Sequence, residues 1–429
     1  MGLGLLGRGI NIVKFLSEMD ADLIVTDLKN ENLLKSALLS LRKYQKIKYV
    51  LGQHRLEDFA GRDMIIKAAG VPLDSVFIKT ARENKIPIEM DASLFAKLTE
   101  ATVIGVTGTR GKSTTASLIY TILKTAGKKV YLAGNIRGTA TLPLLKKAKK
   151  GDLVVLELDS WQLQGFGDSK LSPHISVFTN FMADHMNYYK GDMAAYFNDK
   201  TNIFRYQNKK DFLIIGPELA KTLRKLYKGK IESRKLVTSG TDIPKNWPLK
   251  LAGEHNRENI SCAVKAVEVL GIASGVIKKA VIQFGGLPGR LEYLKNYRGV
   301  RIYNDTNSTT PDAVLAGLKA LSVDKNAVLI MGGADKNLDM DRLIEELPNY
   351  CKEVVLLPGT GTDKIRAGVL ELKGLDTALA TGLKDAIEKS LGLAKRGDII
   401  LFSPGFASFG LFQNEYDRGE KFVNLVRRL

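Results

Sequence analysis

The sequence predicts an α/β protein with three domains, because apolar strand-like runs alternate with helix-like segments in three successive blocks. Glycine-rich turns open the first two blocks, and the 429 residues exceed one ordinary hydrophobic core. The expected domains cover residues 1–93, 94–297 and 298–429. We expect a small Rossmann-like domain, then a central P-loop ATPase-type domain with a parallel sheet, and a Rossmann-like domain at the C-terminus.

The first block begins with a G-x-G-x-x-G turn at Gly2, Gly4 and Gly7. A helix-like stretch follows, and then a strand expected at residues 22–26 that ends in Asp27. An acidic residue about 20 positions after such a turn suits a ribose or uridine hydroxyl. No strand precedes the turn, so either the start lies upstream or this edge is reduced, and the turn alone supports NAD binding weakly.

Two further segments complete the first block. Residues 63–67 are strand-like and run into Ala68-Ala69-Gly70-Val71-Pro72. Residues 90–100 are expected to form a linker to the second block.

The second block opens with the loop 105–114, Gly-Val-Thr-Gly-Thr-Arg-Gly-Lys-Ser-Thr. A strand-like run precedes this loop and a helix-like segment follows it, as in a phosphate-binding loop. Backbone N–H groups of such a loop surround phosphate oxygens, Lys112 reaches the terminal phosphates, and the Ser113 hydroxyl can bind Mg²⁺. The strict spacing requires glycine in place of Val106, and a tight turn with a solvated lysine is the alternative.

Polar side chains end the next three expected strands: Asn135 follows residues 130–133, Glu157 lies within residues 152–158, and His185 follows residues 175–179. A carboxylate in a strand that is otherwise apolar needs a partner. Strand ends of a parallel sheet point towards the ligand crevice, so Glu157 and His185 could both face the phosphate-binding loop. A capped loop histidine is the alternative for His185.

One lysine lies on an apolar helical stripe. Lys200 shares its expected helix face with Met193, Tyr196, Phe197, Ile203 and Phe204. A lysine in this position either extends its ammonium group to solvent or has an inward role, and periodicity alone favours the first.

The rest of the chain continues the alternation. After a strand at residues 211–215, lysine-rich loop-like sequence is expected up to residue 250, and then a helix that begins near Asn256. The third block contains four expected strands, at residues 300–304, 328–331, 353–357 and 398–402. The loops after these strands contain Asp305, residues 332–336 and residues 403–408.

Composition narrows the class of protein. The net charge of +18 favours anionic ligands such as nucleotides, but no alternation of aromatic and basic residues indicates nucleic-acid binding. Cys262 and Cys351 are expected to be buried free thiols in a reducing compartment. No apolar run is long enough to cross a membrane, and we expect a cytoplasmic protein without a membrane partner.

These motifs, in their order and spacing, resemble those of the Mur ligase family along essentially the whole chain. The resemblance is strongest to members that add D-glutamate to UDP-N-acetylmuramoyl-L-alanine, and it implies ATP-driven amide formation through an acyl phosphate during peptidoglycan precursor synthesis. The expected cofactors are ATP, two Mg²⁺ ions and a CO₂-derived carbamate on Lys200, and a monomer is expected.

The resemblance also implies residue roles. Catalytic roles fall on Lys112, His185 and Lys200. The residues that would bind ATP are Gly108, Thr109, Gly111, Lys112, Ser113, Thr114, Asn256, Arg290 and Asp305. The metal ligands would be Ser113, Glu157, His185 and Lys200. The UDP-sugar would contact Gly4, Leu5, Asp27, Gly70 and Asn135, and the amino acid would contact Thr309, Lys336 and Ser408.

Several positions depart from the family pattern. Asn307 replaces a cationic residue, Gly289 replaces a histidine, and Glu415 replaces an aromatic residue that packs on the amino acid. The Ser-Pro-Gly of the nucleotide-sugar domain is Ala68-Ala69-Gly70, and Asn187-Tyr188-Tyr189 lacks the usual carboxylate and arginine. A ligase of this fold with another amino-acid substrate, and a non-catalytic nucleotide-binding protein, are therefore the alternatives.

Overall fold

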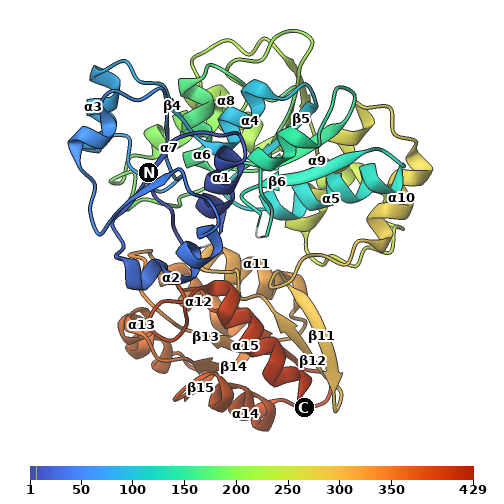
Figure 1. The fold of residues 1–429 in the computed structure, drawn as a ribbon. Coiled ribbons are helices and arrows are strands. Elements are labelled where there is room, and N and C mark those ends of the chain that lie inside the picture. Colours follow the sequence, from blue (N-terminus) through green and yellow to red (C-terminus); the bar gives the residue numbers. More distant parts are fainter. Residues whose placement is uncertain (6, 137) are drawn as a thin grey trace. The chain divides into compact units, whose positions relative to one another are not determined.

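The computed structural model describes residues 1–5, 7–136 and 138–429, shown in Figure 1. The chain divides into two compact units, each a mixture of helices and strands. Unit 1 comprises Met1–Trp247 and Glu258–Val281, and unit 2 comprises Pro248–Arg257 and Ile282–Leu429. None of the described helices is both long and apolar enough to cross a membrane.

The first part of unit 1 contains two parallel strand pairs, β1 with β2 and β3 with β4. Its elements are α1 (Arg8–Ser17), β1 (Leu23–Asp27), α2 (Glu31–Leu41), β2 (Ile47–Leu51), β3 (Ile65–Ile66), α3 (Val76–Glu83) and β4 (Ile88–Glu89).

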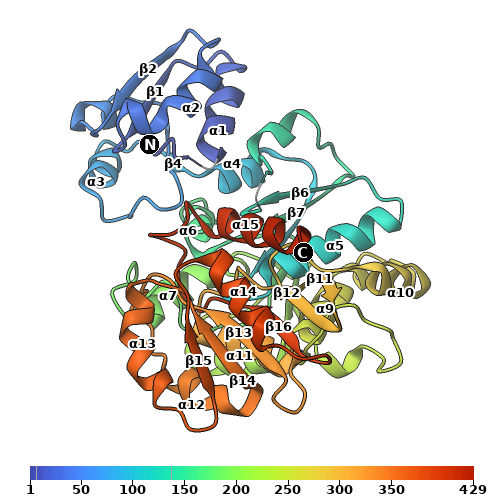
Figure 2. The ribbon, with the colours of Figure 1, turned by 90° about the horizontal axis from the view of Figure 1, so that it is seen from below.

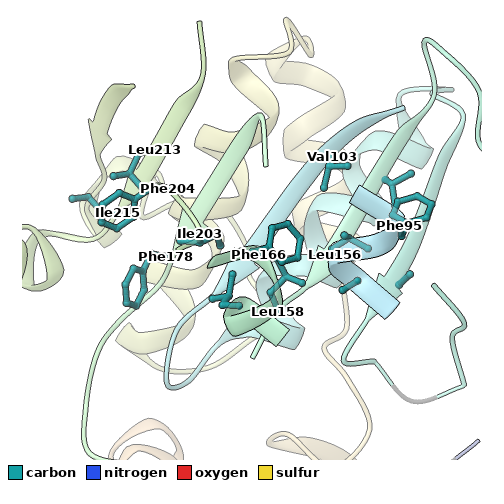
Figure 3. Packing of buried hydrophobic residues seen from close by; sticks show 14 of the residues in the cluster. Phe95, Val103, Leu156, Leu158, Phe166, Phe178, Ile203, Phe204, Leu213 and Ile215 are labelled. Atoms are coloured by element: carbon teal, nitrogen blue, oxygen red, sulfur yellow. The ribbon is translucent and has the colours of Figure 1, made fainter. Parts of the chain in front are cut away.

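The segment expected to be a linker is instead helix α4 (Asp91–Leu98). The linker prediction is wrong because this helix is integrated into the core: Phe95 is fully buried and packs with Leu156 and Phe166 in the same cluster (Figure 3).

A six-stranded, wholly parallel sheet forms the rest of unit 1, in the order β10-β9-β8-β5-β7-β6. Its strands are β5 (Thr102–Thr107), β6 (Val130–Gly134), β7 (Leu153–Glu157), β8 (Ile175–Phe178), β9 (Phe212–Ile215) and β10 (Arg234–Val237). The accompanying helices are α5 (Lys112–Thr125), α6 (Ser160–Asp168), α7 (Met193–Thr201), α8 (Pro217–Leu226), α9 (Glu254–Glu268) and α10 (Ser274–Gln283). The first residues of α9, up to Arg257, and the last two residues of α10 belong to unit 2.

Side chains on both faces of this sheet are buried. Leu156 and Leu158 point to the face covered by α4, α6, α7 and α8, as Figure 3 shows, whereas Val155 is buried on the opposite face, where α5 packs. Burial on both faces explains why the central strands β5, β7, β8 and β9 are mainly apolar. The lysine-rich sequence expected to be loop-like contains α8 and β10, which corrects that prediction, since Leu219 and Leu223 anchor α8.

Unit 2 contains the second sheet, in the order β11-β12-β16-β13-β14-β15, and only β11 is antiparallel to its neighbour. Its strands are β11 (Glu292–Tyr297), β12 (Val300–Asn304), β13 (Ala327–Met331), β14 (Cys351–Leu356), β15 (Asp376–Leu379) and β16 (Ile399–Phe402). Figure 2 shows the helices beside this sheet. One face carries α11 (Pro311–Leu321), α12 (Asp341–Tyr350) and α13 (Thr360–Leu370), and the other carries α14 (Leu383–Leu393) and α15 (Glu415–Arg427).

The boundary of unit 2 lies before the division expected at residue 298. The cause is the β11–β12 hairpin, which pairs Tyr297 with Val300 and therefore joins residues 292–297 to the second sheet. The expected separation of residues 1–93 from the central sheet stays a prediction.

Candidate active site

The phosphate-binding loop requires glycine at two positions. Gly108 has φ +147° and Gly111 has φ +80°, and Gly111 immediately precedes α5. A Cβ on Gly108 would lie 1.9 Å from Thr179 Oγ1, and a Cβ on Gly111 would lie 2.0 Å from Asn259 Oδ1. The loop backbone is thus held from both sides, which orients its N–H groups at the start of α5.

Two lysines meet at one carbonyl of this loop. Lys200 Nζ donates a hydrogen bond of 2.8 Å to the Gly108 oxygen, and Lys112 Nζ donates to the same oxygen over 3.1 Å and to the Thr109 oxygen over 3.0 Å. Lys200 is 1% exposed, so its role is inward and the solvent-directed alternative is wrong. Burial, and then the charge of Lys112, holds the pKa of Lys200 well below its ordinary value.

The segment after β8 is bound to the same loop. Arg110 donates from Nη1 to Asp184 Oδ2 over 3.0 Å, and its backbone N–H donates to Asn180 Oδ1 over 2.8 Å. The next residue, His185, has φ +57°, and its ring packs against Trp161 with the ring centroids 4.6 Å apart and the planes tilted by 50°. The structure therefore brings His185 close to the loop through its neighbour Asp184.

Glu157 ends β7 beside the strand that leads into the loop. It pairs in register with Val106 on one side and Gly134 on the other, and it is 3% exposed. Its carbonyl accepts a hydrogen bond of 2.8 Å from the backbone N–H of Asn135. The predicted site residues on β5, β6 and β7 thus lie at one edge of the sheet, as parallel strand ends should.

These groups fit a phosphate ligand and a hard metal ion. The ammonium group of Lys112 provides positive charge at the loop, and Lys200 places a second nitrogen on the same carbonyl. Ser113 and Glu157 offer the oxygen donors that Mg²⁺ prefers. Across the described residues, no cluster of three or more His, Cys, Asp or Glu side chains is placed to hold a metal ion. A metal here would therefore depend on hydroxyl, phosphate or modified-lysine oxygens in addition to Glu157.

The acidic residue of the N-terminal turn, Asp27, has a structural role that was not expected. Asp27 is 4% exposed, and its two oxygens accept hydrogen bonds from the backbone N–H groups of Gly4 and Lys29 over 2.8 and 2.9 Å. Leu5 is exposed, and so is Gly70. Asp27 thus supports the shape of the turn, and the contact of these residues with a nucleotide stays a prediction.

Within unit 2, Asp305 is fully buried and well bonded. Its oxygens accept from Leu291 N at 3.0 Å, Ser308 Oγ at 2.5 Å and Ser403 Oγ at 2.9 Å. Burial nevertheless raises the pKa of Asp305 to about 6. Two other predicted ATP ligands, Asn256 and Arg290, belong to the same unit.

The three residues expected to bind an amino acid lie on loops that are connected to one another. Lys336 Nζ donates to Thr309 Oγ1 over 3.4 Å, and a bridge between Ala334 and Ala407 joins the Lys336 loop to the Ser408 loop.

Sequence reasoning assigned no role to Arg418, which holds two of these loops from α15. Its guanidinium donates to the Thr306 oxygen at 2.7 Å, to Thr306 Oγ1 at 3.1 Å and to the Phe406 oxygen at 3.1 Å. It also missed Asn259 and Asn180, which contact the phosphate-binding loop. The signal available for Asn180 was its position directly after a predicted strand; no comparable local pattern marks Asn259 or Arg418.

Comparison with known proteins gives consistent matches. The model of the Mur ligase middle domain matches residues 106–267, and the model described as Mur ligase, glutamate ligase domain, matches residues 289–406. The UDP-N-acetylmuramoylalanine–D-glutamate ligase of Roseiflexus sp. (strain RS-1) is 34% identical, with 99% of this chain and 97% of that protein covered. The enzyme of the same name from Borreliella afzelii (strain PKo) is 35% identical, with coverages of 100% and 97%.

Solved structures share the fold at lower identity. The UDP-N-acetylmuramate-alanine ligase MurC of Thermotoga maritima has a TM-score of 0.60 and 18% identity, with 95% of this chain and 99% of that chain covered. The MurF ligase of Thermotoga maritima, in complex with ADP, has a TM-score of 0.62 and 17% identity, with 95% of each chain covered.

Proposed function

The chain belongs to the Mur ligase family, and we propose that it uses ATP to join D-glutamate to UDP-N-acetylmuramoyl-L-alanine. The observation that carries the proposal is the convergence of Lys112 and Lys200 on the Gly108 carbonyl, at the start of α5. Positive charge from Lys112 on a glycine-rich loop suits transfer of a phosphoryl group. The names of the full-length relatives supply the two substrates.

The proposed reaction has two steps. The alanine carboxylate of the nucleotide sugar attacks the γ-phosphorus of ATP, so that an acyl phosphate forms and ADP leaves. The amine of D-glutamate then attacks the acyl carbon, loses a proton, and displaces phosphate. Lys112 holds the phosphates during the first step, and Gly108, Thr109, Gly111, Ser113 and Thr114 surround them with backbone and hydroxyl donors.

Lys200 is the proposed site of a carbamate. The lone pair of a neutral amine forms a bond to the carbon of CO₂ and an N–H proton is released, which leaves a carboxylate-like group. The buried position of Lys200 beside the positive Lys112 favours the neutral amine that this step needs. Ser113, Glu157, His185 and this carbamate would then hold two Mg²⁺ ions, which neutralise phosphate charge when bound.

We assign the substrates to three functional regions. Residues 1–93 bind the nucleotide sugar with Gly4, Leu5, Asp27 and Gly70, and Asn135 contributes from the central region. Residues 94–297 bind ATP, with Asn256, Arg290 and Asp305 as further contacts. Residues 298–429 bind D-glutamate through Thr309, Lys336 and Ser408. The cytoplasmic location and the monomeric state stay predictions.

The test is ATP-dependent phosphate release with UDP-N-acetylmuramoyl-L-alanine and a panel of amino acids that includes both enantiomers of glutamate, with product mass detected. Product with D-glutamate alone is the expected result. Product with another amino acid would leave the mechanism unchanged and alter the specificity. The departures at Asn307, Gly289 and Glu415 make a ligase for another amino acid the second candidate function. No product in the presence of Mg²⁺ and bicarbonate would overturn the proposal.

A further inference from the structure

An arginine with no role in the proposed reaction connects three elements of unit 1. Arg8 begins α1, directly after the glycine-rich turn. Its Nη2 donates to Asn135 Oδ1 over 2.7 Å and lies 3.5 Å from the Gly134 oxygen. Its Nε lies 3.8 Å from Asp91 Oδ2, in the first turn of α4.

We infer that Arg8 is a positioning residue of the nucleotide-sugar site: it fixes the Asn135 carboxamide so that Nδ2 faces an acceptor oxygen of the substrate. The inference rests on the proposed function and deepens it. The acceptor is a phosphate oxygen of the nucleotide or an oxygen of its sugar-peptide part.

The chemistry of the two side chains determines the orientation of the amide. A guanidinium group has only donors, so it can contact the carboxamide only through the oxygen. Nδ2 of Asn135 then points away from Arg8, and the described residues offer this nitrogen no acceptor. The free donor is therefore available to a ligand.

The backbone of Asn135 cannot adjust to another orientation. Its N–H donates to the Glu157 oxygen at 2.8 Å. The preceding Gly134 has φ +87°, and a Cβ there would lie 2.2 Å from the same oxygen. The side chain consequently starts from a fixed point next to Glu157, a proposed metal ligand.

Asp91 holds the guanidinium in place. Its side chain is 4% exposed, whereas that of Arg8 is 29% exposed. The buried Asp91 Oδ2 has no hydrogen-bond partner among the described residues, and the ion pair with Arg8 offsets part of the cost of burying this carboxylate, together with the Ala92 backbone and Gln162. Asp91 thereby restrains Arg8, and Arg8 restrains Asn135.

Asn135→Asp separates the two contacts of the carboxamide. The aspartate keeps an acceptor for Arg8 but has no donor for the substrate. We expect KM for UDP-N-acetylmuramoyl-L-alanine to rise about tenfold, as for loss of one hydrogen bond to a charged or polar group, with kcat and melting temperature little changed.

Arg8→Ala, tested alone and in combination with Asn135→Ala, measures how far the effects of these two residues on KM are coupled. Arg8→Ala alone should raise KM several-fold, because the amide loses its preferred orientation, and it should have no further effect on KM in the Asn135→Ala background. Arg8→Lys, which can still donate to Oδ1, should restore most of the affinity. Arg42→Ala, at an exposed arginine after α2, is the matched control.

Calorimetry with UDP identifies the acceptor. Weaker UDP binding by the uncharged variant Asn135→Ala places the acceptor on the nucleotide, whereas a loss seen only with the complete substrate places it on the sugar-peptide part, and both results support the inference. An unchanged KM in Arg8→Ala, or an equal rise in both backgrounds, would overturn it while the proposed function stands. A wild-type protein that neither binds UDP nor turns over the nucleotide sugar would overturn both.

Discussion

Asn307 and Gly289, two departures from the family pattern, contact each other. The backbone N–H of Asn307 donates to the Gly289 oxygen over 3.1 Å, and the Asn307 side chain donates to the Pro288 oxygen over 3.3 Å. A Cβ at Gly289 would lie 2.8 Å from Asn307 Nδ2 and 2.8 Å from Thr306 Cγ2, and Gly289 has φ +71°. The asparagine therefore occupies space that a side chain at position 289 would need.

Gly289→Ala should destabilise unit 2 through both backbone strain and this contact. The left-handed conformation alone costs about 1–2 kcal/mol for a residue with a Cβ. Asn307→Ala, combined with Gly289→Ala, should recover part of the loss in melting temperature, because one of the two close contacts disappears. Strictly additive effects of the two substitutions would contradict the coupling.

Gly111→Ala should abolish tight ATP binding. The new Cβ would lie 2.0 Å from Asn259 Oδ1, so the loop or α9 must shift, and the phosphate-facing N–H groups shift with it. Gly127→Ala is the matched control, since Gly127 has φ +71° at the other end of α5 but no atom within 4 Å of its Cβ position. Calorimetry with an ATP analogue should show a loss for Gly111→Ala alone; equal affinities in the two variants would contradict the prediction.

Local sequence patterns predicted those parts of the fold that a single short segment of the chain specifies. The phosphate-binding loop is contiguous, and the central strands are apolar throughout because both of their faces are buried. Helical spacing alone placed Lys200 on an apolar stripe, which its burial confirms, but it favoured an ammonium group extended to solvent, which the same burial contradicts. Strands β10 and β15 were missed because most of their side chains are exposed or polar, which removes the apolar pattern of a strand.

Contacts between distant segments could not be predicted in the same way. Arg418 binds Thr306 across 112 residues, and Arg8 binds Asn135 across 127 residues. Such pairs depend on strand order and on helix packing, and a single sequence does not specify either. Asp305 was identified through the family resemblance, but its three hydrogen-bond donors come from separate loops that only the fold brings together.

Lys200→Met should eliminate turnover without unfolding the protein. Methionine fits an apolar site of similar size, and a polar amine costs free energy when it is buried, so the melting temperature should stay equal or rise. Turnover should fall by at least about 10- to 100-fold, which is the loss that follows even from replacing a group that only supports a metal ligand. Lys190→Met, at a side chain that is 80% exposed, is the control, and near-normal phosphate release by Lys200→Met would refute the proposed role.

The carbamate can be tested separately on the unaltered protein. After equilibration with ¹³C-bicarbonate, a carbamate carbonyl signal should appear in the NMR spectrum and be absent from Lys200→Met. Rigorous removal of CO₂ should slow turnover. A rate that is independent of CO₂, together with no such signal, would exclude the modification.

Asp305 should make stability depend on pH between about 4 and 6. Its pKa is raised from 3.8 to about 6 in the folded protein, so in this window the folded state holds a proton that the unfolded chain releases. Stability from Asp305 is therefore complete below about pH 4 and is lost as pH rises to about 6, with a total of about 3 kcal/mol.

Asp305→Asn should remove this dependence, because the amide is neutral at every pH and its oxygen can still accept from Leu291. The melting temperature of Asp305→Asn minus that of the wild type should therefore increase from pH 4 to pH 7. Asp324→Asn, at an exposed site where asparagine tolerates φ +51°, provides the control. A difference that is constant over this range would contradict the raised pKa.

Arg418 should control the affinity for the amino acid through the loops that it holds. Lysine cannot reproduce the forked contacts to both Thr306 and Phe406, and Arg418 is 1% exposed, so Arg418→Lys leaves buried carbonyls without donors. This should cost about 2–4 kcal/mol of unit 2 stability. Because the same loops lead to Thr309 and Ser408, KM for D-glutamate should rise more than KM for the nucleotide sugar. Arg427→Lys, at an exposed position on the same helix, is the control and should change neither the stability nor the two KM values. If Arg418→Lys raises both KM values equally, Arg418 contributes only to general stability.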